Sequence, residues 1–177
     1  MNVKSVFIKL LGKDKREVIN LKKAKTVSES YTCHVQILSQ SSLNGYKRLF
    51  GGRLMEWIDI VAAVVARRHC NLNVTTVSVD NLVFKKPAYA NDTITIEGYI
   101  TYAGRTSMEI CVKTFVENLD GSKEEINTAF LVMVAIDENG KPTEVPKLIL
   151  KSKEDKENYE AALKRKEYRR IRKNESF

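Results

Sequence analysis

Residues 44–69, NGYKRLFGGRLMEWIDIVAAVVARRH, join a polar loop, a glycine pair and a long apolar segment. Apolar residues recur in this segment at helical spacing, so we expect a helix from about residue 52 to residue 69 with one buried stripe. Asp59 lies in its apolar part, one turn away from Met55, Ala62 and Ala63. A carboxylate loses water at such a position, which is costly unless it is paired or takes part in chemistry. Asp59 is therefore the first candidate functional residue.

The length and composition indicate one globular domain with appended ends. The chain has 177 residues, of which 43% are hydrophobic and 29% charged. We expect an N-terminal extension over residues 1–25, the domain over 26–150 and a basic C-terminal helix or tail over 151–177. No apolar run approaches the ~20 residues needed to cross a bilayer, and the first residues lack a small-residue cleavage site. We therefore expect neither a membrane segment nor a signal peptide.

The cysteines and histidines argue against a metal centre or a disulfide framework. Three cysteines, Cys33, Cys70 and Cys111, are odd in number and show no CxxC spacing. The two histidines, His34 and His69, fit structural positions in a strand and at a helix end. We expect no metal and no cofactor, and a reducing cytoplasm as the compartment.

The net charge of +8 predicts an anionic partner, and more than half of the excess lies near the C-terminus. Residues 151–173 hold ten Lys or Arg against five acids and fit a final helix whose few apolar contacts are Tyr159, Leu163 and Tyr168. This segment has three interpretations: a solvated helix, a clamp on nucleotide phosphates, or a nucleic-acid patch.

Extended segments surround the expected helix. Residues 31–38 fit a strand before it, and four segments rich in β-branched residues follow it, at 74–85, 93–102, 107–118 and 126–137. Their short connectors imply antiparallel neighbours, which gives an α+β domain. Because one helix cannot cover both faces of a sheet and the open edge must be managed, we expect a dimer or a larger oligomer.

Five pieces of the sequence, in this order, resemble a known family. They are Asn44 in its loop, LFGGRLMEWID (49–59), VSVDNLVFKKPA (77–88), GRTSME (104–109) and FLVMVAID (130–137). The chain is similar in these pieces to hotdog-fold acyl-CoA thioesterases of the cytosolic acyl-CoA hydrolase type. The resemblance extends from about residue 31 to residue 146.

The resemblance implies a fold, a substrate and an assembly. The fold would be an antiparallel sheet wrapped around a long central helix, here with an additional C-terminal helix. The substrate would be acyl-CoA, with coenzyme A as part of substrate and product. Subunits would form homodimers with sites at their interface, and the dimers would associate further into hexamers as trimers of dimers. The catalytic pair would be Asp59 of one subunit and Asn44 of its neighbour.

Thioester hydrolysis assigns roles to three residues. Asp59 would be a general base that activates water or a direct nucleophile, and the alternative is a carboxylate that pairs with an arginine or faces a solvated gap. The amide of Gly52, at the positive helix start, is the expected oxyanion donor, although close packing also explains a glycine there. Asn44 would orient water or substrate, although Asn-Gly is also a common turn pair.

Further residues are candidates for binding the substrate. Thr76 and Ser78 could form hydrogen bonds near the thioester, although solvent-facing hydroxyls are commoner on strands. The candidate contacts for the coenzyme A phosphates are Gly104, Arg105, Thr106, Ser107, Lys85 and Lys86. Charged residues around a turn glycine are also an ordinary property of hairpins. Residues Arg48, Leu49 and Phe50 replace the small or imidazole residues of many relatives, which bears on acyl-chain preference.

Other function classes have weaker support. The sequence has no GxSxG elbow, P-loop or dinucleotide-binding GxGxxG. A hotdog dehydratase would need a histidine close to Asp59. The remaining alternative is a non-catalytic protein that senses acyl-CoA or binds nucleic acid through the basic tail. A basic tail without aromatic residues on a sheet face gives the latter little support, so we expect no nucleic-acid partner.

Overall fold

The computed structural model describes residues 24–175, so most of the expected N-terminal extension lies outside the described residues. The elements in chain order are β1 (Lys25–Thr26), η1 (Val27–Glu29), β2 (Thr32–Ile37), η2 (Gln40–Ser42), α3 (Gly51–Cys70), β3 (Asn73–Phe84), β4 (Thr93–Ala103), β5 (Ser107–Glu117), β6 (Lys123–Ile136), β7 (Leu148–Ile149) and α4 (Lys153–Glu175). The central helix, the five principal strands and the final helix all lie where the sequence predicts them.

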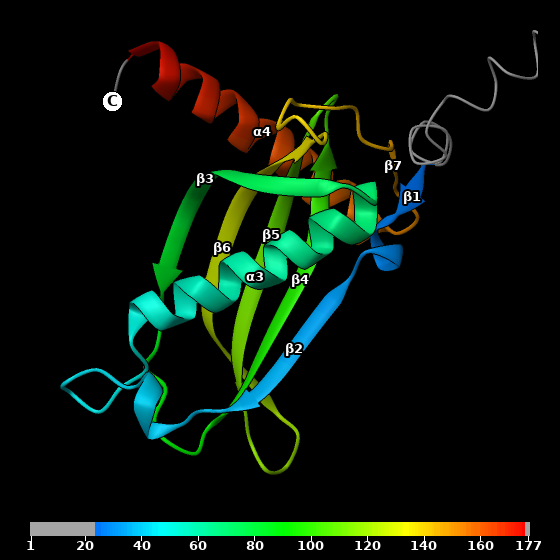
Figure 1. Cartoon of the computed structure of the whole chain (residues 1–177). Helices are drawn as coiled ribbons and strands as arrows, with labels where there is room; N and C mark the ends of the chain where they lie inside the picture. The colour runs from blue at the N-terminus through cyan, green and yellow to red at the C-terminus, as the bar shows by residue number, and fades with distance from the viewer. Residues whose placement is uncertain (1–23, 176–177) are drawn as a thin grey trace, which may run out of the picture.

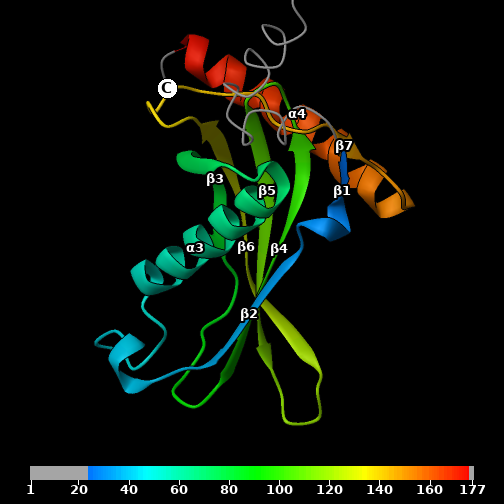
Figure 2. The same cartoon turned by 45° about the vertical axis from the view of Figure 1, so that its right-hand side comes forward.

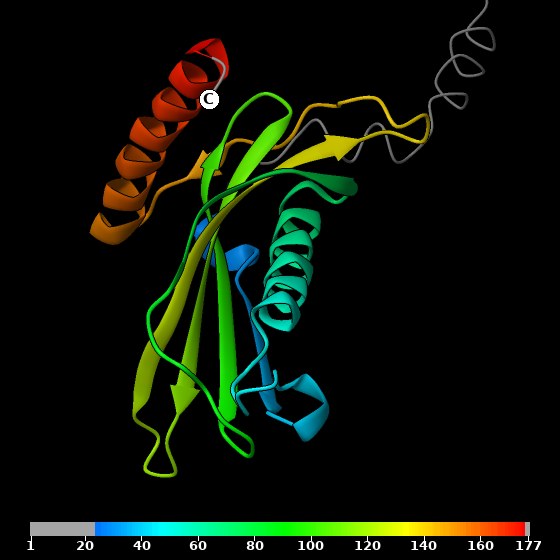
Figure 3. The same cartoon turned by 90° about the vertical axis from the view of Figure 1, so that its left-hand side faces the viewer.

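Five strands form one antiparallel sheet in the order β2-β4-β5-β6-β3 (Figure 1). The long helix α3 packs on one face of this sheet and α4 on the other (Figure 3). The expected α+β architecture is therefore confirmed. The parallel pair of β1 and β7 was not predicted from the sequence; it links Lys25 to the segment just before α4.

The apolar stripe of α3 lies directly on the sheet. Leu54, Ile58, Val61 and Val65 are buried on this stripe. Gly98 of β4 permits the close approach, because a Cβ atom there would lie 2.7 Å from Val61 Cγ1 and 2.9 Å from Val65 Cγ2. Glycine at this position thus lets the helix pack tightly enough to fill the core.

A bulge in β3 changes which side chains face α3. Thr76 pairs with Met133 of β6, whereas Ser78 pairs with Val132, so the register shifts between the two pairs. Because Met133 and Val132 are consecutive, they point to opposite faces of the sheet. Thr76 therefore faces α3, while Ser78 and Asp80 face the side of α4. Without the bulge, residues 76, 78 and 80 would all share one face.

Helix α4 crosses the sheet from β4 to β3 (Figure 2). Near its start, Tyr159 packs against Tyr102 of β4, with ring centroids 5.5 Å apart. Further along, the Arg165 guanidinium lies 3.8 Å from the ring centroid of Phe130 on β6. The helix thus crosses one end of the sheet face that α3 leaves open (Figure 3).

Arginines hold the second half of α4 in place, beyond the buried Ala162. Glu109 of β5 is 1% exposed and accepts hydrogen bonds from Arg165 Nη2 at 2.8 Å and Arg169 Nη1 at 2.6 Å. The expected apolar contacts are partly wrong, because Leu163 is 43% exposed and Tyr168 is 65% exposed. A buried carboxylate needs paired cations, and α4 supplies them.

No helix within residues 24–175 is long and apolar enough to span a membrane. Cys33, Cys70 and Cys111 are free thiols, the first exposed and the other two buried.

Candidate functional site

Asp59 is half-buried on the side of α3 that faces β3. Its Oδ1 accepts a hydrogen bond of 2.6 Å from the hydroxyl of Thr76. The Thr76 hydroxyl also lies 3.3 Å from Met133 Sδ, which restricts its orientation. The structure therefore brings together two of the candidate residues, the acid of the central helix and a hydroxyl of the edge strand.

The second oxygen of this carboxylate is available for chemistry. Among residues 24–175, neither an arginine nor a lysine pairs with Asp59, and Oδ2 accepts no hydrogen bond. Asp59 is thus not part of an ion pair among the described residues, which argues against a purely structural carboxylate. One oxygen is held by Thr76, and the other is free to accept a proton or to attack a carbon.

Asn44 stabilises its own loop and retains a donor. Its Oδ1 accepts hydrogen bonds from the backbone amides of Tyr46 at 2.9 Å and Arg48 at 3.2 Å. Lys47 completes the turn with a φ of 58°. Turn formation therefore occupies the side-chain oxygen, whereas Nδ2 has no partner among the described residues. The residue can form the turn and still donate a hydrogen bond to a ligand.

Asn44 and Asp59 lie apart in a single chain. Helix α3 begins at Gly51, and eight residues of helical rise place Asp59 about 12 Å further along the axis. The loop that carries Asn44 extends away from the start of α3 (Figure 1). A site that uses both residues therefore needs Asn44 from another copy of the chain.

Gly51 and Gly52 form the first turn of α3, where backbone N–H groups have no partner within the helix. A Cβ atom at Gly52 would lie 2.7 Å from Phe50 Cε1, and one at Gly51 would lie 3.3 Å from Phe84 Cζ. Close packing of these rings thus accounts for the glycines. Gly52 itself is exposed, and its amide is a donor at the positive end of the helix.

The candidate phosphate contacts form two separate groups. Gly104 and Ser107 close the turn between β4 and β5 through a backbone hydrogen bond of 2.8 Å, with Arg105 exposed on it. Ser107 pairs with Val134 near the end of β6. Thr106 lies in the same turn, and its carbonyl oxygen accepts a hydrogen bond from the amide of Ala135.

Lys85 and Lys86 lie at the other end of β6, where they form ion pairs with Glu125 and Glu124. Nine residues of strand separate Glu125 from Val134, or about 30 Å. One phosphate group therefore cannot contact both groups of a single chain. Exposed ion pairs of this kind are weak, so the lysines can exchange their glutamates for another anion.

Ser78 and the basic tail differ from expectation. Ser78 faces the side of α4 and lies away from Asp59, because of the bulge beside Thr76. Arg165 and Arg169 of the tail form ion pairs with Glu109, and Arg169 and Arg172 form ion pairs with Asp80. Burial would raise the pKa of Asp80, but hydrogen bonds from Arg172 and Arg169 hold it below its usual range. These partners were not predictable from the sequence, which shows the positive charge of the arginines but not the acids that the fold places beside them.

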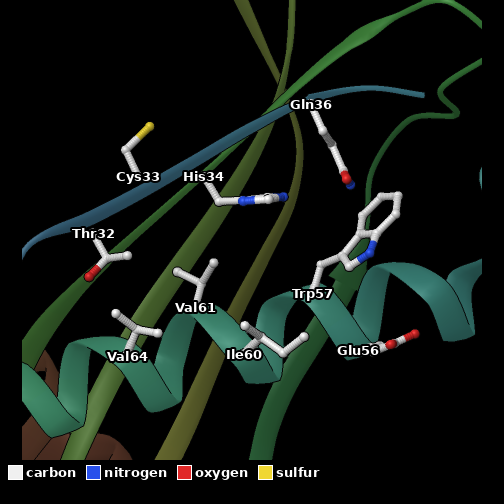
Figure 4. Close-up of a pocket in the computed structure, with 9 residues that line it drawn as sticks. All are labelled: Thr32, Cys33, His34, Gln36, Glu56, Trp57, Ile60, Val61 and Val64. Atoms are coloured by element: carbon white, nitrogen blue, oxygen red, sulfur yellow. The ribbon is translucent and has the colours of Figure 1, made fainter. Parts of the chain in front are cut away.

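A pocket that the sequence did not predict lies between α3 and β2 (Figure 4). Its volume is about 360 Å³, and Gln36 and Trp57 point toward one another across it. Asp59 faces β3, at the opposite edge of the sheet, so this pocket is separate from the candidate site.

The histidines are not close to Asp59. His69 is fully buried, its Nε2 lies 3.0 Å from the Pro146 carbonyl oxygen, and burial lowers its pKa. A neutral imidazole is thus favoured at the end of α3, which fits the structural position expected for His69. His34 lines the pocket beside β2. Within residues 24–175, no group of three or more His, Cys, Asp or Glu residues could hold a metal ion.

Comparison with known proteins places this architecture in a family. The family described as the thioesterase superfamily matches residues 46–121. YkhA of Bacillus subtilis, named as an uncharacterized acyl-CoA thioester hydrolase, is 40% identical over 134 residues, which are 75% of this chain and 78% of that protein. This chain belongs to the thioesterase superfamily. Among its relatives, the cytosolic acyl coenzyme A thioester hydrolase of Rattus norvegicus is 33% identical over 138 residues, 76% of this chain and 36% of the longer rat protein.

Solved structures confirm the hotdog fold of this thioesterase. The acyl-CoA hydrolase of Staphylococcus aureus, in complex with butyryl coenzyme A, coenzyme A and coenzyme A disulfide, superimposes with a TM-score of 0.83 at 32% identity, covering 87% of this chain and 94% of that chain. An apo hexameric acyl-CoA thioesterase gives a TM-score of 0.82 at 38% identity, with coverages of 85% and 97%. The expected enzyme class, a thioester hydrolase, is therefore confirmed.

Three solved variants of the S. aureus hydrolase replace one asparagine, one aspartate and one threonine with alanine. The replaced asparagine and aspartate are 15 positions apart, and the aspartate and threonine are 17 positions apart. Asn44, Asp59 and Thr76 of this thioesterase have the same two intervals.

Proposed function

We propose that this thioesterase hydrolyses acyl-CoA to a free acid and coenzyme A, with Asp59 as the catalytic carboxylate. The observation that carries the proposal is the geometry of this residue: Thr76 holds Oδ1 at 2.6 Å, and Oδ2 is unpaired among the described residues. The names of the relatives support the substrate class. The matching intervals between the asparagine, the aspartate and the threonine support the choice of residues.

Two chemical routes use the same free oxygen. In the first, Asp59 Oδ2 takes a proton from water as the water oxygen attacks the thioester carbon. In the second, Oδ2 attacks that carbon directly, and water then hydrolyses the mixed anhydride. In both routes the carbon–sulfur bond breaks, the thiolate of coenzyme A takes up a proton, and the acyl group gains the oxygen of water. Thr76 orients the carboxylate in either case.

The developing oxyanion needs donors that the Asp59 side of one chain does not provide. Asn44 lies in the loop that leads into α3 and the amide of Gly52 lies in the first turn of the helix, so another copy of the chain would supply the two together. A donor directed at the carbonyl oxygen is typically worth about 10²–10³ in rate.

Pairing two copies through β3 would complete the site. This strand is an edge of the sheet, and its exposed residues include Val77, Val79 and Val83. A twofold axis at the edge makes the two strands antiparallel, so the Phe84 end of one copy lies beside the Asn73 end of the other. Because α3 starts near Phe84, this arrangement brings the Asn44 loop of one copy toward the Asp59 region of the other.

The same axis would join the two groups of candidate phosphate contacts. Lys85 and Lys86 of one copy would move to the sheet end that carries Arg105 in the other. The same twofold axis would thus bring Asn44 close to Asp59 and the two lysines close to Arg105, although a single chain holds the members of each pair apart. We propose that Arg105, Thr106 and Ser107, with the two lysines of the second copy, bind the phosphates of coenzyme A.

We also propose that the dimers associate as trimers of dimers in the cytoplasm. Hexameric relatives support the assembly, and the cytosolic relative supports the location.

A thiol-release assay with acyl-CoA esters from short to long chains tests the proposal. We expect turnover by the natural chain and a loss of about 10²–10⁴ in kcat for Asp59→Ala, because its acid–base or nucleophilic group is gone. Asn44→Ala should also lose most turnover, while both variants keep the natural assembly in sedimentation experiments. Glu144→Gln, which removes an exposed carboxylate, is the matched control and should keep natural turnover. Natural hydrolysis by Asp59→Ala would refute the assignment.

The non-catalytic alternatives make different predictions. An acyl-CoA sensor would bind coenzyme A esters in calorimetry without releasing thiol. A nucleic-acid binder would need free cations, yet three arginines of α4 are committed to Glu109 and Asp80. These contacts give the nucleic-acid alternative less support, and calorimetry together with thiol release tests the sensor.

A further inference from the structure

The C-terminal end of α4 reaches the edge strand β3 and continues past it (Figures 1 and 2). Arg172 Nη2 donates a hydrogen bond of 2.5 Å to Asp80 Oδ1, and Arg169 Nη1 lies 3.1 Å from Asp80 Oδ2. Asp80 therefore fixes the point at which the helix crosses the edge. The last residues of α4 project beyond the chain's own sheet.

This end of α4 presents apolar side chains with little to cover them. Tyr168 is 65% exposed and Ile171 is 38% exposed. Both line a groove of about 500 Å³ between α4 and β3, whose other lining residues are Asp80, Asn81, Arg165, Arg172 and Glu175. Exposed apolar side chains in a groove beside an unpaired strand edge suit contact with another protein surface.

The position of Asp80 identifies that surface. Strand β3 has 12 residues, so pairing over its full length with a second copy places the twofold axis between Ser78 and Val79. Asp80 is then about 5 Å from the axis along the strand. A helix that crosses the edge this close to a twofold axis meets the same helix of the other copy.

The charges of α4 allow two such helices to approach. The helix is basic, and two bare basic helices would repel each other. Asp80 and Glu109 place two carboxylates against Arg165, Arg169 and Arg172 at the crossing point and leave one positive charge of the three. The buried acids thus reduce the repulsion where the two copies would come closest.

We infer that the C-terminal end of α4 forms a second layer of the contact between two copies of this chain, on the sheet face opposite α3. Tyr168 and Ile171 pack against the same residues of the second copy across the axis. This inference rests on the proposed pairing of two copies through β3 and adds a surface that the proposed catalytic site does not use.

Ile171→Glu tests the contact, with Leu163→Glu as the matched control. Both changes place an acid at a partly exposed apolar position of α4, with exposures of 38% and 43%, but Leu163 lies two turns before the edge. We expect the dimer dissociation constant of Ile171→Glu to rise about tenfold or more, and that of Leu163→Glu to stay within about twofold of the natural value. Dilution series in analytical ultracentrifugation or mass photometry measure both. Equal dissociation constants for the two variants would overturn the inference.

Cross-linking gives an independent measurement. In a Cys33→Ser background, which removes the exposed thiol, Ile171→Cys should form covalent dimers on mild oxidation, because a residue beside a twofold axis faces its own copy. Leu163→Cys should stay monomeric on a denaturing gel. Cross-linking of both variants, or of neither, would contradict the inference.

The outcome can be separated from that of the proposed function. If the chain releases thiol from acyl-CoA but Ile171→Glu associates normally, the second layer is refuted and the catalytic proposal stands. If Ile171→Cys cross-links but no acyl-CoA is hydrolysed, the contact stands and the catalytic proposal is refuted.

Discussion

The hydroxyl of Thr76 lies 2.6 Å from Asp59 Oδ1 and joins the edge strand to the central helix. This contact depends on the bulge beside Thr76, which turns that side chain toward α3 while Asp80 faces α4. A single bulge in β3 thus directs Thr76 to one face of the sheet and Asp80 to the other. Bulges commonly direct a side chain toward an active site in this way.

Thr76→Val tests whether the Thr76 hydroxyl orients Asp59, because the change removes the hydroxyl and keeps the packing. Valine fills nearly the same volume but cannot donate a hydrogen bond, so Asp59 Oδ1 loses its partner. A hydrogen bond to a charged group is worth about 1.5–3 kcal/mol, which corresponds to a fall in kcat of about tenfold to a hundredfold. Steady-state kinetics on acyl-CoA measures kcat and KM for each variant.

The conservative change supplies the control. Thr76→Ser keeps the hydroxyl and should recover most of the kcat, because it restores the bond to Asp59. If Thr76→Val matches the natural chain, or if serine is no better than valine, Thr76 does not orient the carboxylate.

The helices and the long strands were predictable because each segment has the residue spacing or composition of its own type of secondary structure. The stripe that contains Leu54, Ile58 and Val61 has helical spacing, and the helix extends from Gly51 to Cys70, one residue longer at each end than expected. The β-branched segments gave the five principal strands. Strands β1 and β7 have two residues each, too few for any period to be visible.

Properties that depend on pairing between distant residues were not predictable. Sequence spacing showed Asp59 among apolar neighbours, but the choice of Thr76 over Ser78 depends on a register shift against β6. The positive charge of α4 can be read from the sequence, but the burial of Glu109 beneath Arg165 and Arg169 cannot, because it depends on how α4 packs on the sheet. Long-range partners of this kind are decided by tertiary packing and not by local pattern.

Glu109→Ala should release α4 from the sheet. The change removes the acid that pairs with Arg165 and one of the two acids that pair with Arg169, and leaving a buried charge unpaired costs about 3–5 kcal/mol of unfolding free energy. We expect faster proteolysis within α4 and a lower denaturant midpoint. Limited trypsin digestion followed by mass spectrometry locates the first cleavage.

Glu157→Gln is the control for this change, because its ion pair with Lys153 is exposed and should contribute little. Glu109→Gln should lie between the two, since it keeps a hydrogen-bond acceptor without the charge. If Glu109→Ala and Glu157→Gln have the same stability and the same cleavage rate, the arginine contacts do not anchor the helix.

The contribution of Asp80 to stability should decrease in acid. Although burial opposes it, hydrogen bonds from Arg172 and Arg169 lower the pKa of Asp80 in the folded chain. A lowered folded pKa gives stability that is fully present above the unfolded pKa of about 3.9 and is lost as the pH falls through the folded pKa. The difference in unfolding free energy between the natural chain and Asp80→Asn should therefore be constant from pH 7 to about pH 5 and shrink below about pH 4.

Urea unfolding at a series of pH values measures this difference. A gap between the two chains that stays constant down to pH 2, or that widens in acid, would show that the Asp80 carboxylate does not gain its stability from the arginines.

Mixing two inactive variants should restore activity if each site uses Asn44 of one copy and Asp59 of another. Unmixed Asn44→Ala and Asp59→Ala each carry one defect in every site. When the two are unfolded together and refolded, half of the dimers are mixed, and each mixed dimer has one site with both natural residues and one site with neither. We therefore expect about a quarter of the natural kcat per subunit from an equimolar mixture, measured by thiol release.

A mixture of Asp59→Ala with Thr76→Val should recover much less, because the same copy of the chain supplies Asp59 and Thr76 to a site. If the first mixture recovers no activity, Asn44 and Asp59 do not act together across two copies. If both mixtures recover equal activity, the recovery does not depend on whether the two replaced residues come from different copies, and the shared site is refuted.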